Sequence, residues 1–199
     1  MTPLHGAIVL AAGASARLGR AKQLLDIDGE PALRRVARCV LSTDPLDCVV
    51  VLGHEAERVE TALDGIRVRT LRIIDADTGM AASLGAGVNA LDARCEGALI
   101  VLTDQPALTA EHLGALVEAW RSAPTQAAAS AYAGVLGVPA LLPRTWFGEV
   151  AALRGNVGAR ALLRARADEV IAITAPDLAH DVDTPGDLVR VARANARRL

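Results

Sequence analysis

The only lysine of the chain stands in a glycine-containing stretch that is suited to bind phosphate. Lys22 follows Gly13, Ser15, Arg17 and Gly19, which come after an apolar run. Small residues let the backbone approach an anion closely, and the hydroxyl and the two cations can bind phosphoryl oxygens. All other basic side chains are arginine. A compact ammonium fits between phosphoryl oxygens where a planar guanidinium is too wide. These residue types predict a site for the triphosphate of a nucleotide.

The glycine spacing matches neither of the two common phosphate-binding motifs. Gly13 and Gly19 enclose five residues, no Lys-Ser or Lys-Thr pair follows, and the pattern G-x-G-x-x-G is absent. The sequence therefore disfavours a Walker-type kinase and an NAD-dependent dehydrogenase of the usual kind.

Two acidic segments are candidates for binding a metal ion. Asp104 follows an apolar run by one residue, where a carboxylate is a natural Mg²⁺ ligand, although a role as a turn former or helix cap is equally open. Asp181 and Asp183 are two residues apart and share one face of an extended segment. We expect Asp183 to be the second metal ligand. From the residues alone, His180 fits a structural histidine slightly better than a substrate contact.

A further segment combines the pattern of a buried helix with a possible anion site. Met80, Leu84 and Val88 have the spacing of a helix core. Gly79 precedes them directly after an expected strand, so the first amides of the helix should be free, and Ser83 lies one turn in. Both uses of the segment stay open.

Apolar runs alternate with helical patterns along the chain, which is typical of strands covered on both faces by crossover helices. This order predicts an α/β fold with a doubly wound, mostly parallel, Rossmann-like sheet and helices on both faces. Ligands of such sheets bind beyond the carboxyl ends of the strands, where the segments above lie. The expected strands are 7–11, 48–52, 68–74, 98–102 and 170–174, and the expected helices are 31–41, 55–63, 80–91 and 109–120.

The pattern changes between about residues 126 and 166. Two strands around 134–137 and two short helices read as an insertion that faces the acceptor, before the sheet resumes at 170 and a last helix begins at Pro185. We expect a single domain, 1–199, with a nucleotide-binding half (1–125) and an acceptor-binding half that includes the closing strand and helix (126–199).

Composition limits the classes of function. The chain has 199 residues, 52% of them hydrophobic, which suffices for one sizeable core. A net charge of −2 without runs of one sign, and 2% aromatic residues, predict no nucleic-acid partner. No apolar run approaches the ~20 residues of a membrane span. Three cysteines without a C-x-x-C pair favour neither a disulfide framework nor a zinc site. We expect a reduced cytoplasmic protein that does not bind membranes.

Five groups of motifs, spread over almost the whole chain, resemble the molybdenum cofactor nucleotidyltransferases of the MobA-like NTP transferases, and most of all their cytidylyltransferase branch. They are LAAGASARLG with Lys22, TGMAASL, TDQP, GVPA with GNVGAR, and DVDTPGDL. LAAG and DQP favour the cytidylyl branch over the guanylyl branch. The resemblance implies the fold of the nucleotide-diphospho-sugar transferases.

The resemblance also implies an activity: Mg²⁺- or Mn²⁺-dependent, in-line transfer of CMP from CTP to molybdopterin, with release of pyrophosphate. Lys22, Arg17 and Asp104 would be the catalytic residues, and Asp104 and Asp183 would bind the metal. The implied nucleotide-binding residues are Leu10, Ala11, Ala12, Gly13, Ser15, Gly19, Lys22, Asp75, Gly79 and Ser83, and the implied acceptor-binding residues are Gln105, Gly137, Pro139, Asn156 and His180. A molybdenum hydroxylase or its maturation factor would be the protein partner.

Two positions depart from the family pattern. Asn156 stands where the pattern has an acid, and Asp75 stands where it has an asparagine. The first change removes a charge near the acceptor, and the second alters the hydrogen bonding beside the base. A transferase of the same fold that uses GTP, ATP or another phosphorylated acceptor therefore stays open. So does a non-catalytic protein that binds or delivers the molybdopterin dinucleotide.

Overall fold

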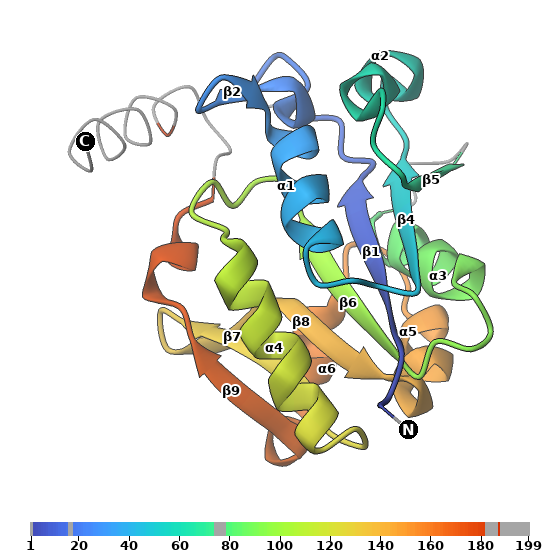
Figure 1. Cartoon of the computed structure of the whole chain (residues 1–199), viewed down its shortest axis with the longest axis vertical. Helices are drawn as coiled ribbons and strands as arrows, with labels where there is room; N and C mark the ends of the chain where they lie inside the picture. Colours follow the sequence, from blue (N-terminus) through green and yellow to red (C-terminus); the bar gives the residue numbers. More distant parts are fainter. Residues whose placement is uncertain (1, 16–17, 74–78, 182–186, 188–199) are drawn as a thin grey trace.

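A seven-stranded sheet forms the centre of the computed structural model, which describes residues 2–15, 18–73, 79–181 and 187 (Figure 1). The strand order is β5-β4-β1-β6-β8-β7-β9. Neighbouring strands are parallel except at β8, which is antiparallel to β6 and β7. The strands are β1 (His5–Ala11), β4 (Asp47–Leu52), β5 (Arg69–Arg72), β6 (Gly97–Leu102), β7 (Ala127–Tyr132), β8 (Val135–Pro143) and β9 (Val170–Thr174), with a separate pair β2 (Asp26–Ile27) and β3 (Glu30–Pro31).

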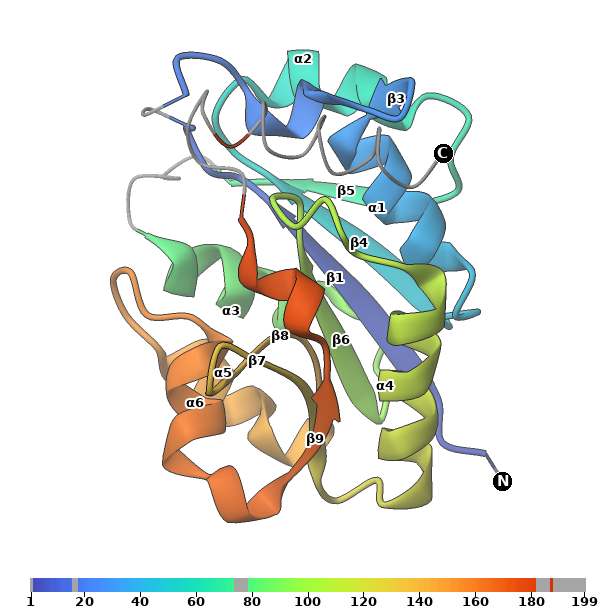
Figure 2. The ribbon, with the colours of Figure 1, turned by 90° about the vertical axis from the view of Figure 1, so that its left-hand side faces the viewer.

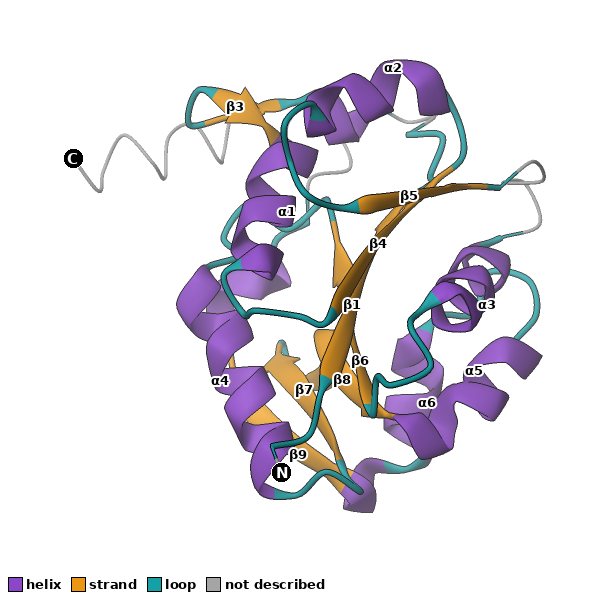
Figure 3. Cartoon of the chain, turned by 45° about the vertical axis from the view of Figure 1, so that its right-hand side comes forward, coloured by secondary structure: helices purple, strands orange, loops and turns teal. Residues whose placement is uncertain are grey.

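Helices cover both faces of the sheet, as Figure 3 shows with the sheet seen nearly edge-on. One face carries α1 (Ala32–Leu41) and α4 (Ala110–Ser122), and the other carries α3 (Met80–Ala90), α5 (Phe147–Ala152) and α6 (Ala159–Ala165). The expected α/β fold is confirmed. The remaining helical segments are α2 (Ala56–Glu60), η1 (Lys22–Leu24), η2 (Thr61–Leu63), η4 (Arg144–Trp146), η5 (Ala167–Glu169) and η6 (Pro176–Ala179).

The central strand β1 is apolar from Gly6 to Ala11 because both of its faces are covered. All seven of its residues are buried. Side chains alternate between the faces of a strand. Val9 accordingly belongs to the core cluster under α1 and α4, which contains Trp120, and Ile8 belongs to the cluster under α3 and α5, which contains Trp146. This double burial holds the carboxyl end of β1 in a fixed place.

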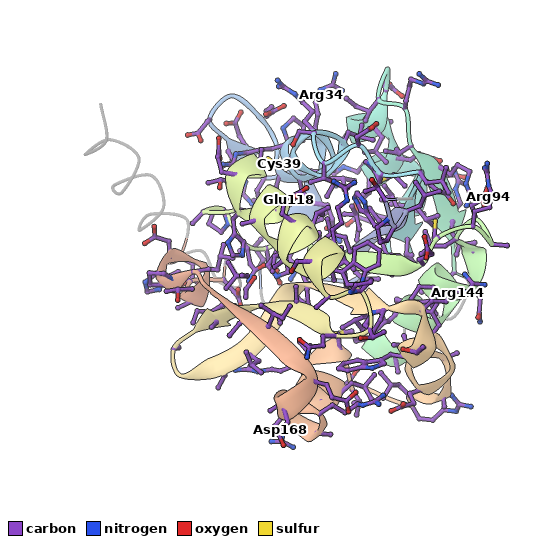
Figure 4. All side chains as sticks on the ribbon, turned by 60° about the horizontal axis from the view of Figure 1, so that its bottom comes forward. Arg34, Cys39, Arg94, Glu118, Arg144 and Asp168 are labelled. Carbon is purple, nitrogen blue, oxygen red and sulfur yellow. The ribbon has the colours of Figure 1, made fainter. Side chains whose placement is uncertain are left out.

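Strand β5 differs from the long apolar strand that the sequence predicts. It covers only 69–72, lies at the edge of the sheet, and carries Arg69 and Arg72. Arg69 donates to Asp47 of the adjacent strand, with Nη2 and Oδ2 2.5 Å apart, and Arg72 pairs with Glu60. Charged side chains on an edge strand oppose pairing with another chain. Figure 4 likewise shows charged side chains at the periphery, among them Arg94.

The predicted helices agree with the structure to within a few residues. Thr109 caps α4, since its side chain accepts a hydrogen bond from the His112 amide at 3.2 Å. The helix expected over 55–63 is the short α2 followed by η2. The helix expected from Pro185 lies outside the described residues. No helix in the described ranges is long and apolar enough to span a membrane.

The segment 126–166 is not an insertion that interrupts the sheet, as the sequence pattern suggested. Strands β7 and β8 form a hairpin inside the sheet, with β8 paired to β6 and β7 paired to β9. The physical reason is that Pro139–Pro143, the second half of β8, is buried. That apolar run is stable only beside another covered strand.

A buried histidine makes the stability of the fold depend on pH. His5, at the start of β1, is 1% exposed, and its Nε2 lies 3.0 Å from Thr43 Oγ1. Burial, helped by the positive charge of Arg121, lowers the pKa of His5 to about 4. The unfolded chain binds this proton near its ordinary pKa of about 6.5. The free energy of unfolding is therefore highest above that pH and falls as the pH drops towards 4, by roughly 3 kcal/mol in all.

We expect the variant His5→Gln to lose much of this sensitivity to acid. Urea unfolding at about pH 7 and about pH 5 should show a drop of roughly 2 kcal/mol for the parent chain that the variant largely lacks. Equal losses in the two proteins would show that His5 is not responsible.

Candidate active site

An ion pair between Lys22 and Asp104 lies at the carboxyl ends of two paired strands. Lys22 Nζ is 2.5 Å from Asp104 Oδ2, and the two side chains are 20% and 12% exposed. Strands β1 and β6 are parallel neighbours, with Leu10 opposite Leu102, so the segments that follow them emerge at the same edge of the sheet. Lys22, predicted to bind phosphate, and Asp104, predicted to bind the metal ion, are therefore in contact.

The backbone that follows β1 is anchored through its carbonyl groups. Gln23 Nε2 donates to the carbonyl oxygens of Ala11 at 2.7 Å and Gly13 at 3.0 Å, and the His54 amide donates to Ala12 O at 3.2 Å. In a trans peptide the N–H points opposite to the C=O. The amides that follow Ala11 and Gly13 therefore point to the side opposite Gln23, where they can bind an anion.

Leu10, Ala11 and Ala12, all implied to bind the nucleotide, have buried side chains that are at most 8% exposed. Their side chains therefore offer little surface to a nucleotide.

Ser15 is hydrogen-bonded within the segment from Ala12 to Lys22, which is expected to bind phosphate and is called the phosphate loop below. Its Oγ accepts a hydrogen bond from the Lys22 amide at 3.1 Å, and its carbonyl accepts from Leu18 at 2.9 Å. Because the oxygen is used as an acceptor, the hydroxyl hydrogen can be donated to a phosphate oxygen. Gly19 has φ +70°, a conformation that favours glycine. Arg17 lies outside the described residues.

The donor atoms at Asp104 suit a hard divalent metal ion. Its Oδ1 is buried and has no hydrogen-bond partner among the described residues. A carboxylate oxygen of this kind is the ligand that Mg²⁺ or Mn²⁺ prefers beside phosphate. Asp183 and Asp75 lie outside the described residues, and the described ranges contain no cluster of three or more metal-binding side chains. Asp104 thus fits a metal ion that would be held mostly by nucleotide phosphates and by only one or two carboxylates of the protein.

Gln105 points into the protein instead of into open space. It is 2% exposed, and its Nε2 donates to Val138 O at 3.0 Å and Leu178 O at 3.3 Å, with the Tyr132 hydroxyl at 3.5 Å. The Tyr132 hydroxyl itself donates to Val138 O at 2.9 Å. Side chains from two segments therefore hold the carbonyl that precedes Pro139.

Gly137 and Pro139 pack against side chains of β7. A Cβ at Gly137 would lie 2.3 Å from the Tyr132 hydroxyl oxygen, so only glycine fits there. The Pro139 carbonyl accepts from Ser130 Oγ at 2.7 Å, and His112 Nε2 lies 2.7 Å from the same hydroxyl oxygen. Burial lowers the pKa of His112, which keeps the ring neutral at neutral pH. The expected acceptor residues of the hairpin are thus held in a fixed conformation.

Two segments predicted to bind different substrates meet at the start of α3. The Ala81 amide donates to Gly155 O at 3.1 Å, which corrects the expectation that the first amides of this helix are free. Gly79 has φ +96°, and a Cβ there would lie 2.4 Å from Gly155 O and 2.7 Å from Asn156 Oδ1. Ser83 is only 5% exposed. Figure 2 shows α3, α5 and α6 along one side of the molecule.

Charged groups from separate elements act on the Tyr132 hydroxyl. Burial raises the pKa of Tyr132, Asp181 and Asp104 raise it further, and Arg160 opposes them. Arg160, in the first turn of α6, is exposed. Arg160 and Asp181 are therefore near enough to Tyr132, whose hydroxyl Gln105 contacts, to act on its ionisation. His180, which follows η6, is exposed.

Sequence reasoning missed Gln23, Arg160 and Tyr132. Gln23 directly follows the only lysine, Arg160 ends the motif GNVGAR, and Tyr132 is the only tyrosine of the chain. Each of these features was a usable signal, but nothing in the sequence shows which way the side chains point.

Comparison with known proteins places the chain in a family. It matches the MobA-like NTP transferase domain over residues 7–170. It is 33% identical to the purine catabolism protein PucB of Bacillus subtilis, over 94% of this chain and 95% of that protein. It is also 33% identical to the bifunctional protein GlmU of Rhodococcus opacus, over 61% of this chain but only 26% of that protein.

Solved structures agree. Rv0371c from Mycobacterium tuberculosis superposes with a TM-score of 0.84 at 29% identity, covering 97% of this chain and all 100% of that one. The same protein in complex with manganese gives 0.79 at 27% identity, covering 96% and 98% of the two chains. A nucleotidyl transferase from Methanothermobacter shares the fold, with a TM-score of 0.83 at 24% identity and coverage of 98% and 99%. The chain belongs to the MobA-like NTP transferase family and is a nucleotidyltransferase.

Proposed function

We propose that the protein transfers CMP from CTP to the terminal phosphate of molybdopterin, with Mg²⁺ or Mn²⁺, and releases pyrophosphate. The observation that carries this proposal is the Lys22–Asp104 ion pair beside the anchored phosphate loop. A cation for the leaving pyrophosphate and a carboxylate for a metal ion are the two groups that nucleotidyl transfer needs at one place.

The reaction requires alignment and charge neutralisation, without a covalent enzyme intermediate. An oxygen of the acceptor phosphate attacks the α-phosphorus of CTP in line and forms a new P–O bond. The bond from the α-phosphorus to the oxygen that bridges to the β-phosphate breaks, and its electron pair leaves with pyrophosphate. The acceptor phosphate is already ionised at neutral pH, so no side chain needs to remove a proton. The protein contributes positioning and electrostatic stabilisation.

The residues at the strand ends take separate roles in this scheme. Lys22 leaves Asp104 and binds the β- and γ-phosphates, while the loop amides and the Ser15 hydroxyl donate to phosphate oxygens. Arg17 assists Lys22. Asp104 and Asp183 would hold the metal ion, which when bound neutralises phosphate oxygens. Lys22 thus neutralises the carboxylate of Asp104 before CTP and the metal ion bind, and it neutralises the pyrophosphate during the reaction.

The choice of substrates rests on the motifs and on the relatives. LAAG and DQP favour cytidylyl transfer, and the name of PucB links a full-length relative to purine catabolism. Supply of a molybdopterin dinucleotide to a molybdenum hydroxylase that oxidises a purine would join both indications. A transferase of the same fold that uses another nucleotide or acceptor is the second candidate. It is favoured by Asn156, which stands where the pattern has an acid and lies beside Gly79.

Arg160 is our candidate for binding the acceptor phosphate. It is exposed, makes no hydrogen bond or ion pair with another described residue, and acts electrostatically on Tyr132 at the end of the hairpin. A guanidinium without a partner among the described residues can bind a phosphate dianion through charge-assisted hydrogen bonds.

A pyrophosphate-release assay tests the activity. CTP with molybdopterin should release pyrophosphate, whereas GTP, ATP or omission of molybdopterin should give little.

Lys22→Ala or Asp104→Asn should lower turnover by about a hundredfold or more, as when one transition-state group is lost in other enzymes. Lys22→Arg should lower turnover as well, because a planar guanidinium is too wide to fit between phosphoryl oxygens. Arg58→Gln, which alters an exposed ion pair with Glu55, serves as the control. Parental rates in the Lys22 or Asp104 variants would contradict the assignment.

Removal of the lysine should strengthen metal binding in the absence of nucleotide. In Lys22→Met the carboxylate of Asp104 loses an adjacent cation, so a divalent ion meets less repulsion. We expect the affinity for Mn²⁺, measured by electron paramagnetic resonance without CTP, to rise about tenfold, which is 1.4 kcal/mol. Unchanged or weaker Mn²⁺ binding would show that Lys22 and the metal ion do not share Asp104.

Arg160→Gln should raise the KM for the acceptor about tenfold and leave the KM for CTP unchanged. Arg164→Gln, one turn further along α6 and also exposed, is the matched control. Because Tyr132 is the only tyrosine, the ultraviolet absorbance of its phenolate gives a second measurement. Arg160 lowers the pKa of Tyr132, so its removal should raise that pKa, whereas the Arg164 variant should not. Equal effects of the two variants would exclude a specific role for Arg160.

A further inference from the structure

Each residue of the Lys22–Asp104 pair is followed in the chain by a buried glutamine. Gln23 is 1% exposed and Gln105 is 2% exposed. Glutamine is mostly exposed in folded proteins, and a buried amide is tolerated only where it is hydrogen-bonded. The burial of both residues beside the two charged groups therefore has to be explained by what they hold.

Gln23 holds the nucleotide side. Its Nε2 donates to Ala11 O at 2.7 Å and to Gly13 O at 3.0 Å, which uses both amide hydrogens. Ala11 is the last residue of β1, and Gly13 is in the phosphate loop. The side chain thus ties the loop to the strand end at the position next to Lys22.

Gln105 holds the acceptor side by the same means. Its Nε2 donates to Val138 O in β8 and to Leu178 O in η6, at 3.0 Å and 3.3 Å. The first contact fixes the hairpin at Pro139, and the second fixes the segment that leads to His180. One amide therefore joins the turn that carries Asp104 to two segments far along the chain.

The other end of each amide is left without a partner. Oε1 of Gln23 and Oε1 of Gln105 are buried and accept no hydrogen bond from any described residue. An unsatisfied buried acceptor is destabilising. Glutamine would therefore be a poor choice at either position if it contributed only to stability. What both side chains supply is a pair of N–H donors for backbone carbonyls.

We propose that Gln23 and Gln105 are matched positioning residues, with Gln23 fixing the nucleotide loop relative to Lys22 and Gln105 fixing the acceptor segments relative to Asp104. The two side-chain amides hold separate stretches of backbone, so nucleotide and acceptor are positioned independently. This inference rests on the proposed nucleotidyl transfer but holds for any nucleotide and acceptor.

The test compares Gln23→Met with Gln105→Met, which keep the volume of the side chain and remove its donors. Gln23→Met should raise the KM for CTP about tenfold and change the KM for molybdopterin by less than about twofold, and Gln105→Met should do the reverse. The reason is that each variant releases the backbone that is proposed to bind only one of the two substrates. Each variant is the control for the other. Thermal unfolding of both variants shows whether the fold is intact.

A second measurement does not depend on the reaction. Calorimetric titration with CTP and Mn²⁺, without acceptor, should show weaker binding in Gln23→Met and parental binding in Gln105→Met. If the parent binds CTP but transfers nothing to molybdopterin, the proposed acceptor is wrong, and this contrast still decides the inference. Equal changes in both variants, or a lower melting temperature with parental KM and binding values, would overturn it.

Discussion

The contact between Lys22 and Asp104 is the constraint on which the site depends. An ammonium and a carboxylate that are largely buried stabilise each other only as a pair, since either alone would be an uncompensated charge. The pairing of β1 with β6 brings them together, because adjacent parallel strands end at one edge. A triphosphate would supply a new partner for the ammonium, and its metal ion would supply one for the carboxylate. Both charges would therefore stay balanced when the nucleotide binds.

The sheet makes that contact possible by fixing the strand ends, and side-chain amides extend the rigid part beyond them. β1 is buried along its full length, so the first residues of the phosphate loop start from a fixed backbone. Gln23 donates to the carbonyl of Ala11 at the end of β1, and Gln105 donates to the carbonyl of Val138 in β8. The active edge is therefore built from loops whose carbonyls are satisfied by buried donors, which leaves other backbone groups for ligands.

The sequence predicted those parts that depend on local pattern. The apolar runs of β1, β4 and β6 and the capped start of α4 are visible because burial on both faces and capping act on neighbouring residues. The rule for parallel strands placed Lys22 and Asp104 at the same edge of the sheet, whereas their direct ion pair was not predicted. The hairpin inside the sheet, the inward turn of Gln105 and the capping of Ala81 by Gly155 did not follow. These features arise from partners distant in the chain, which one sequence does not reveal.

The backbone contact between Gly155 and the start of α3 limits how such enzymes can diverge in sequence. The loop expected to meet the acceptor also caps the start of the helix expected to meet the base, through a backbone hydrogen bond and a glycine with no room for a side chain. A relative cannot lengthen or reshape this loop for a bulkier acceptor without loosening that helix end. Changes of acceptor should thus be accompanied by changes at Gly79, and chimaeras should retain their selectivity only when the loop and the start of α3 are exchanged together.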